Sequence, residues 1–136
     1  MANPAKKDGA SYEARFTAEA LARGFDVMEP VGDYLPYDRL VLNSRRETFN
    51  VQIKGTPHQQ RGKQSFKLIA APGKSGTKVL LSPDEVDVFA AYVAPANAWY
   101  LIPVDKLTAK SVSLSPLNDS SVAKYEPFRD AWNVFA

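Results

Sequence analysis

The first periodic segment of the chain has the apolar spacing of an amphipathic helix. Apolar side chains recur about every four residues, which places them on one helical face, and Glu13 lies at the border of that face. Gly24 follows at the position where helices commonly end. The pattern therefore predicts a helix over residues 11–23 that packs through one face. The apolar stripe consists of Tyr12, Phe16, Ala20 and Leu21.

Short apolar segments follow, separated by turn-forming Gly, Pro, Asn and Asp, and they have the length of β-strands. The expected strands cover residues 25–29, 38–43, 49–55, 66–70, 88–93 and 99–104. Residues 107–117 are expected to be irregular or a weak strand. The sequence SPDE at residues 82–85 predicts the start of a short helix, and residues 126–135 a closing helix. This order predicts an α/β fold with a central mixed sheet flanked by helices.

One of these strands carries polar side chains on one face. Side chains alternate along a strand, so Gln52 and Lys54 point to the same side, while their apolar neighbours point to the other. A hairpin whose turn is centred near Arg45 puts Asp38 opposite Gln52. An acid, an amide and an ammonium group then share one face of the sheet. A register slip of one residue would instead move Gln52 to the opposite face.

Length and composition set limits on the class of protein. The 136 residues indicate a flexible leader at residues 1–8 and a single domain over residues 9–136. No apolar run approaches a membrane-spanning length, and none follows the basic N-terminus, so neither a transmembrane helix nor a secretory signal is expected. Cysteine is absent, which excludes disulfides, a thiolate nucleophile and Cys-based zinc sites. These features favour an intracellular, cytoplasmic protein that does not bind membranes.

The single histidine excludes metal sites built from several histidines, and no nucleophile-elbow sequence accompanies it. His58 lies in a polar loop, where a solvated side chain is the simpler interpretation. The large aromatic residues alternate with apolar neighbours, which favours burial over a base-stacking surface. The residues expected in the core on this basis are Trp99, Tyr100 and Trp132.

Positive charge is concentrated in the middle of the chain. Residues 45–78 hold eight basic side chains and one acidic side chain, a net charge of +7, so the rest of a chain whose total is +2 carries −5. Such asymmetry predicts a face that attracts a nucleic acid, unless these residues form only a solvated, loop-rich region. The basic residues expected to contact phosphates are Arg45, Arg46, Arg61, Lys63 and Lys67.

The polar residues of the hairpin are those that metal-assisted hydrolysis of a phosphodiester requires. A divalent cation neutralises charge on the phosphate and lowers the pKa of an attacking water. Mg²⁺ prefers oxygen ligands from one or two carboxylates, and a nearby lysine can orient the water or stabilise developing charge. Asp38, Gln52 and Lys54 supply such groups, and Glu13 on the first helix is a further candidate.

These residues resemble the motif of the PD-(D/E)XK nuclease superfamily. Pro36-Tyr37-Asp38 stands where the family has its Pro-Asp pair, and Gln52-Ile53-Lys54 stands where it has (D/E)-x-K. Glu13 matches the acid of the family's first helix, and the order of helix, strand, turn and strand is also similar. The resemblance covers about residues 9–104 and is to small members, which include Holliday-junction-resolvase-like enzymes and an intron-encoded homing endonuclease. It implies a restriction-endonuclease-like core.

The resemblance also implies roles for individual residues. Asp38 would be the principal metal ligand, with the side-chain oxygen of Gln52 and the carbonyl of Ile53 as further ligands. Lys54 would act on the attacking water or the scissile phosphate. Glu13 would complete the site directly or through a metal-bound water. The implied cofactor is Mg²⁺, with Mn²⁺ as a substitute and no small-molecule cofactor. The implied partner is DNA, and cutting both strands would need a homodimer or a higher symmetric oligomer.

Two departures from the family motif keep other functions open. Tyr37 separates the proline from the acid, and Gln52 replaces the second acid. An amide oxygen can bind a hard cation but brings no negative charge, so weaker metal binding is expected. The alternatives are a non-catalytic nucleic-acid-binding module on the same fold and a protein-interaction domain. In these alternatives Glu13 is an exposed helix charge and Asp38 caps a turn, while Gln52 and Lys54 form a solvated strand face.

Overall fold

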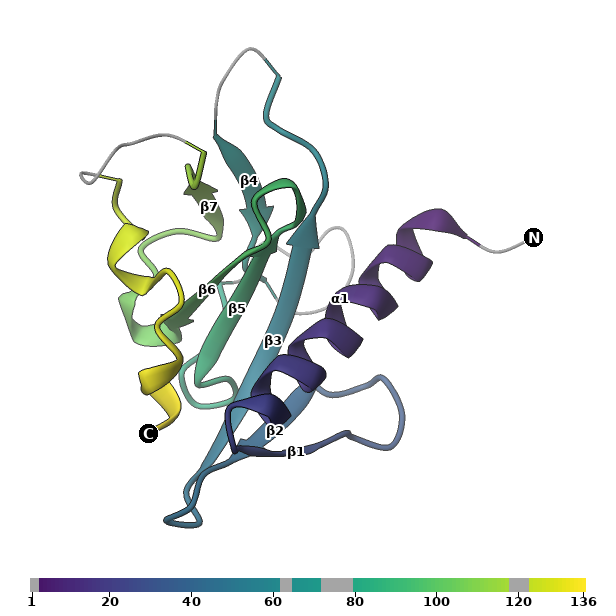
Figure 1. Ribbon diagram of the computed structural model, residues 1–136, viewed down its shortest axis with the longest axis vertical. Helices are drawn as coiled ribbons and strands as arrows, with labels where there is room; N and C mark the ends of the chain where they lie inside the picture. The colour runs from purple at the N-terminus through teal and green to yellow at the C-terminus, as the bar shows by residue number, and fades with distance from the viewer. Residues whose placement is uncertain (1–2, 62–64, 72–79, 118–122) are drawn as a thin grey trace.

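The computed structural model describes residues 3–61, 65–71, 80–117 and 123–136, and it contains two sheets and one long helix (Figure 1). The larger sheet has five strands in the order β1-β2-β3-β5-β6, and the smaller sheet pairs β4 with β7. The helix is α1, Pro4–Ala22. The strands are β1 Asp26–Met28, β2 Arg39–Leu42, β3 Thr48–Thr56, β4 Phe66–Ile69, β5 Val88–Val93, β6 Ala98–Pro103 and β7 Ser111–Leu114.

Helix α1 begins earlier than its apolar stripe predicts. The side-chain oxygen of Asn3 accepts hydrogen bonds from the backbone N–H groups of Ala5 (3.0 Å) and Lys6 (3.4 Å), and Pro4 occupies the first turn. The expected leader was therefore wrong for residues 4–8, which are helical. The end of the helix agrees with the prediction, because Gly24 follows with a φ of 93°, a conformation that favours glycine.

The hairpin of β2 and β3 has the expected register. Arg39 pairs with Val51 and Leu42 pairs with Thr48, so the polar side chains of β3 lie on the face that the sequence analysis expects. Strand β3 pairs with β5 in parallel, whereas the other pairings of the five-stranded sheet are antiparallel, which makes the sheet mixed. The predicted fold class is thus confirmed.

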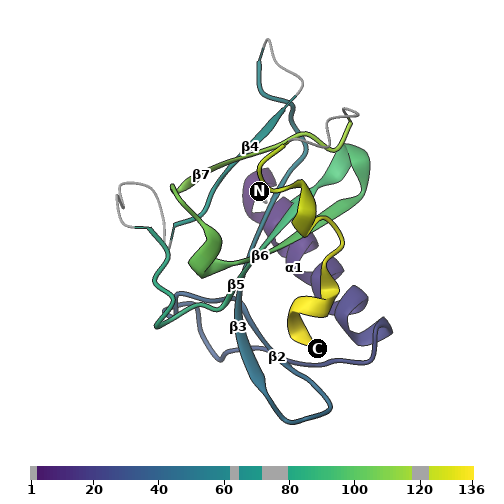
Figure 2. The ribbon, with the colours of Figure 1, turned by 90° about the vertical axis from the view of Figure 1, so that its left-hand side faces the viewer.

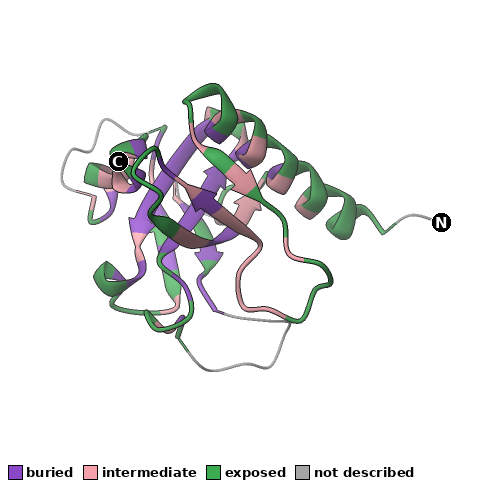
Figure 3. Ribbon diagram, turned by 90° about the horizontal axis from the view of Figure 1, so that it is seen from below, coloured by how far each residue is buried: buried purple, intermediate pink, exposed green. Residues whose placement is uncertain are grey.

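The two faces of the large sheet are covered by different elements, α1 on one side and the β4–β7 pair on the other (Figure 2). On the helix side, Tyr12 and Phe16 of α1 pack with Val51 and Ile53 of β3. Helix and strand approach closely there, because a Cβ atom at Gly55 would lie 2.4 Å from the Tyr12 ring. Strands β5 and β6 are buried along almost their whole length, in contrast to the outer surface of α1 (Figure 3).

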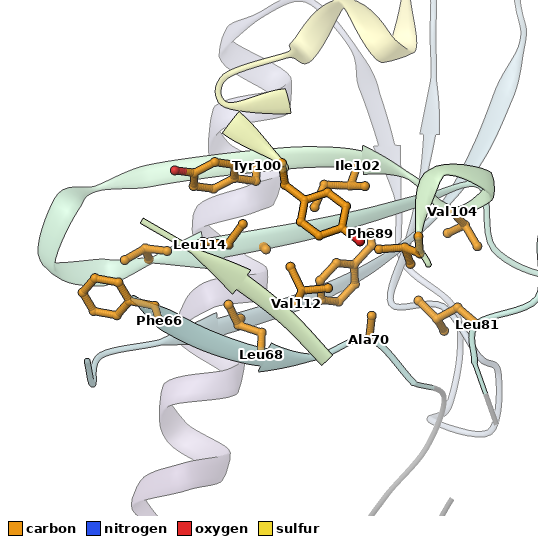
Figure 4. Close-up of a cluster of buried hydrophobic side chains, with 14 of the residues drawn as sticks. Phe66, Leu68, Ala70, Leu81, Phe89, Tyr100, Ile102, Val104, Val112 and Leu114 are labelled. Atoms are coloured by element: carbon orange, nitrogen blue, oxygen red, sulfur yellow. The ribbon is translucent and has the colours of Figure 1, made fainter. Parts of the chain in front are cut away.

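A second apolar cluster fills the space between the large sheet and the β4–β7 pair (Figure 4). Phe89 and Tyr100 point into this cluster from β5 and β6. Trp99 and Trp132 lie in the cluster on the helix side, so the prediction that the three aromatic residues are core is confirmed. Lys54 and Gln52 pair with β5 residues of the second cluster, so they leave β3 on the side of β4.

Two of the expected helices are shorter structures. After Ser82 the chain forms a single turn, closed by the N–H of Val86 donating to the Ser82 carbonyl (2.9 Å), because Val86 is buried and the buried strand β5 begins at Val88. At the C-terminus, Glu126–Phe128 and Trp132–Phe135 are separate 3-10 turns. Asp130 interrupts them with a φ of 52°, which a continuous helix does not allow. No helix in the described part of the chain is long and apolar enough to cross a membrane.

Candidate active site

Asp38 lies where β2 begins, at the edge of β3. Its backbone N–H donates to the Val51 carbonyl (2.8 Å), and its carboxylate accepts a hydrogen bond from the N–H of Ile53 (2.8 Å). The N–H and carbonyl of one strand residue leave at the same edge of the strand. The Ile53 carbonyl therefore leaves β3 on the side of Asp38, which is the position that a backbone metal ligand requires.

The surroundings of Asp38 act on its charge in opposite directions. Burial raises the pKa of this carboxyl above its ordinary value, whereas the hydrogen bond from Ile53 and the positive charges of Lys54 and Arg39 lower it. Lys54 is half-buried and makes no ion pair with another described residue. A carboxyl group whose ionised form is disfavoured by burial thus lies near an ammonium group that has no ion-pair partner among the described residues.

Gln52 is buried, with 4% of its surface exposed, and its two side-chain polar atoms differ in environment. The amide nitrogen donates to the carbonyl of Ala71 (3.0 Å). A carbonyl only accepts hydrogen bonds, so this contact fixes which end of the amide faces Ala71. The other end, Oε1, is buried with no hydrogen-bond partner among the described residues. Such an acceptor needs a donor or a cation.

Glu13 reaches the same region from α1, and it is held by a residue that the sequence analysis did not single out. The guanidinium of Arg39 donates to the Glu13 carboxylate (3.1 Å) and to the carbonyl of Asp38 (2.7 Å). Burial and the nearby Asp38 charge raise the pKa of Glu13, and the Arg39 charge opposes them. The signal for Arg39 in the sequence was its position directly after the candidate acid, on the helix-facing side of β2.

Glu13, Asp38 and Arg39 line one cavity of about 230 Å³, together with residues of the segment between β1 and β2. Among the described residues, no three His, Cys, Asp or Glu side chains gather as a metal cluster. The candidate oxygens are the Glu13 and Asp38 carboxylates in this cavity and, outside its lining, Gln52 Oε1 and the Ile53 carbonyl on β3. This set fits a hard divalent cation that keeps several waters, as Mg²⁺ does.

The basic residues of the candidate nucleic-acid surface do not form one patch. Arg45 and Arg46 are exposed in the turn before β3, and Arg61 is exposed in the loop after it, so the nine residues of β3 separate them (Figure 1). Nine strand residues span roughly 30 Å. Arg45 is also paired with Glu47 (3.0 Å).

Only one of the two remaining residues of this group lies in the described part of the chain. Lys67 is exposed on β4, and Lys63 falls outside the described residues. His58 is exposed in its loop, as the sequence analysis expects. Arg61 follows the end of β3 near which Lys54 lies, whereas Arg45 and Arg46 lie beyond the opposite end of that strand.

Comparisons with known proteins identify a family for this chain and solved structures with a similar fold. A family model described as PD-(D/E)XK endonuclease matches residues 3–132. The bacterial homing endonuclease I-Ssp6803I has a similar structure, with a TM-score of 0.82 and 19% identity over 97% of this chain and 93% of that chain. Hjc, a Holliday junction resolvase from the archaeal hyperthermophile Archaeoglobus fulgidus, has a TM-score of 0.53 and 18% identity over 90% and 89% of the two chains. No curated protein matches the sequence.

Proposed function

Because the chain belongs to the PD-(D/E)XK endonuclease family, we propose that it is a divalent-metal-dependent endonuclease that hydrolyses phosphodiester bonds in DNA. The resemblance expected from the sequence is thereby confirmed at the level of the family. The observation that carries the proposal is the edge of β3, where the Asp38 carboxylate is bound to the Ile53 N–H beside Lys54. That arrangement places a carboxylate, a strand backbone N–H group and an ammonium group near one another.

The metal ligands in this proposal are the Asp38 carboxylate, Gln52 Oε1 and the Ile53 carbonyl. The Ile53 N–H holds the carboxylate in place, and the Ala71 carbonyl directs the amide so that Oε1 is the free end. A bound Mg²⁺, or Mn²⁺ in its place, would lower the pKa of an attacking water and neutralise charge on the phosphate. The neutral amide brings no charge to the centre, so we expect moderate metal affinity.

Lys54 is proposed to act on the attacking water or on the charge that develops at the scissile phosphate. Its ammonium group makes no ion pair with a described residue, so it is available to a phosphate. Arg61, exposed in the loop after β3, and Lys67, exposed on β4, are proposed to hold the DNA backbone. Arg45 and Arg46 would contact a more distant part of the substrate.

DNA is the proposed substrate because the two similar structures named above are those of a homing endonuclease and a Holliday junction resolvase, enzymes that act on DNA. One domain carries one candidate centre. Cutting both strands of a duplex would therefore need a homodimer or a higher symmetric oligomer.

The test is cleavage of a substrate panel of supercoiled plasmid, duplex, single strand, flap and four-way junction. Each is incubated with Mg²⁺ or Mn²⁺ and either wild-type protein or Asp38→Ala. We expect a metal-dependent product that the variant does not form. A product that persists with Asp38→Ala would show that the proposed centre is wrong.

A non-catalytic DNA-binding role is the second candidate, favoured by two observations. Gln52 replaces an acid, and Glu13 is already bound to Arg39. In that role the protein would bind the panel with an affinity that falls steeply with salt but does not depend on Mg²⁺, and no substrate would be cut.

A further inference from the structure

Arg39 is the most extensively bonded charged side chain near the candidate centre, with only 12% of its side chain exposed. It contacts Glu13 and the Asp38 carbonyl, and its Nε atom donates to the Thr17 hydroxyl (3.0 Å). One further guanidinium nitrogen lies 4.0 Å from the Glu29 carboxylate. These contacts hold the guanidinium between α1 and the edge of β2.

Arg39 is also the only basic side chain among the described residues that line the 230 Å³ cavity. Four carboxylates line the same cavity. They belong to Glu13, Glu29, Asp33 and Asp38. Carboxylates that line one cavity attract cations even when, as among the described residues here, no three of them are close enough to form a metal cluster. A fixed positive charge in the cavity therefore competes with any metal ion that enters.

We propose that Arg39 is a resident counter-ion that occupies Glu13 in an ion pair and thereby lowers the affinity of the Asp38 centre for a divalent cation. This inference rests on the proposed function and deepens it. Arg39 contacts neither the proposed metal nor the substrate in this proposal, so it is a positioning residue that acts through Glu13. Glu13 is then held as the partner of Arg39 and is not a direct metal ligand.

The geometry supports this assignment over direct metal binding by Glu13. The Glu13 carboxylate is bound at 3.1 Å by a guanidinium that the Thr17 hydroxyl and the Asp38 carbonyl hold from other directions. Thr17 is in turn anchored, because its hydroxyl donates to the Glu13 carbonyl (3.1 Å). Moving Glu13 onto a metal would break a connected network, which is costly in a partly buried site.

The test is Mn²⁺ binding to the DNA-free protein, measured by calorimetry and by electron paramagnetic resonance of free Mn²⁺. Arg39→Gln removes the charge, and we expect it to bind Mn²⁺ roughly three- to tenfold more tightly, the size of effect expected for a charge next to a partly hydrated site. Arg39→Met keeps the apolar stem and serves if the Gln variant fails to fold. Arg39→Lys restores the charge and should bind within about twofold of wild type.

Two further variants separate charge competition from a structural effect. In Glu13→Gln combined with Arg39→Gln, the gain in affinity should disappear, because the freed carboxylate is what attracts the metal. Arg23→Gln is the matched control. It breaks the ion pair between Arg23 and Glu19 of α1, whose N–O distance of 3.1 Å equals that of the Arg39–Glu13 pair, and it should leave Mn²⁺ affinity unchanged.

The outcomes distinguish this proposal from the proposed function. Mn²⁺ binding by wild type that Asp38→Ala abolishes would support the centre. Given that result, a folded Arg39→Gln or Arg39→Met protein with unchanged or weaker binding overturns the counter-ion role alone. No Mn²⁺ binding by wild type, Arg39→Gln or Arg39→Met would overturn both proposals.

Discussion

Two carboxylates bind backbone N–H groups of β3, and only one of them lies in the candidate centre. Asp38 accepts from Ile53 at 2.8 Å at the β2 edge, and Asp87 accepts from Asn50 at 2.7 Å at the β5 edge. The hydrogen bonds are nearly equal in length. The hydrogen bond to the strand therefore does not distinguish the proposed catalytic acid, Asp38, from Asp87.

The two acids differ in what surrounds them. Asp38 is half-buried beside Lys54 and Glu13, and burial raises its pKa. Asp87 is exposed, and the 340 Å³ cavity beside it has one further carboxylate, that of Asp105, and no basic residue among its described lining residues. Of the two acids, only Asp38 combines a raised pKa with a nearby cation and a second acid, and this combination is why the catalytic centre is proposed there.

Apart from the change at Asp38 itself, the largest expected effect on the cleavage rate comes from Lys54. Lys54→Met should lower the cleavage rate by roughly 10²- to 10³-fold, because a positioned donor at the developing charge is lost. DNA binding should weaken only modestly. The measurement is the single-turnover rate on the best substrate of the panel. The control is Lys106→Met, because Lys106 is an exposed lysine 52 residues after Lys54 in the sequence. A Lys54 variant that cuts as fast as this control would remove Lys54 from the centre.

Gln52→Glu is expected to destabilise the metal-free protein by about 1–3 kcal/mol, because a carboxylate oxygen would face the Ala71 carbonyl at the 3.0 Å now bridged by the amide. Chemical denaturation of the variant measures this, with the exposed Gln59→Glu as the matched change. Added Mn²⁺ should restore more stability to Gln52→Glu than to wild type, since the new charge favours the cation. If Mn²⁺ has the same effect on both proteins, Gln52 is not a ligand.

Asp38→Asn should raise stability near neutral pH by about 1 kcal/mol or less, as expected when a functional charge is removed from a partly buried site. An increase in stability is expected because the pKa of Asp38 is raised, which means that folding disfavours the ionised form of this carboxyl. The stability that the protonated wild-type group contributes is present below its ordinary pKa of 3.8 and is lost as the pH rises through the raised pKa. Thermal unfolding from pH 3 to pH 8 should therefore show the difference from wild type closing as the pH falls. A constant difference would argue against a buried charge.

The smallest expected effects are those on DNA affinity of basic residues that lie outside the candidate centre. Arg61→Gln should weaken binding about equally for all sequences and lower the slope of log affinity against log salt by about 1, because one phosphate contact is lost. Arg45→Gln should have a smaller effect on short substrates that do not reach the far end of β3. Fluorescence anisotropy at several salt concentrations measures both. An unchanged slope for Arg61→Gln would exclude that contact.

Much of the fold was predictable from local pattern. The turn near Arg45 and the alternation of polar and apolar residues fixed the β2–β3 register, which aligns Arg39 with Val51. The start of α1 was not predictable, because the part of the helix before Tyr12 carries no apolar stripe and depends on the Asn3 cap. The prediction of a short helix after Ser82 was wrong although the local sequence has a good helix-start signal, because the chain there enters the buried strand β5.

The candidate site was predictable in its residue types but not in its contacts. Asp38 and Lys54 come together through the hairpin, whose register can be read from the sequence. The partner of Gln52 is Ala71, nineteen residues away, and the partner of Glu13 is Arg39, twenty-six residues away. Contacts at such separations depend on how β4 and α1 pack, which alternation along one strand does not determine.

The proposed function requires that Asp38, and not every acid bound to β3, forms the catalytic centre. The most direct measurement is the Mg²⁺-dependent cleavage rate of Asp38→Asn beside Asp87→Asn, both checked for folding by circular dichroism. We expect a loss of roughly 10³-fold or more for Asp38→Asn, since the principal ligand's charge is removed, and a change within about threefold for Asp87→Asn. Equal losses in both variants, or normal cleavage by Asp38→Asn, would contradict the claim.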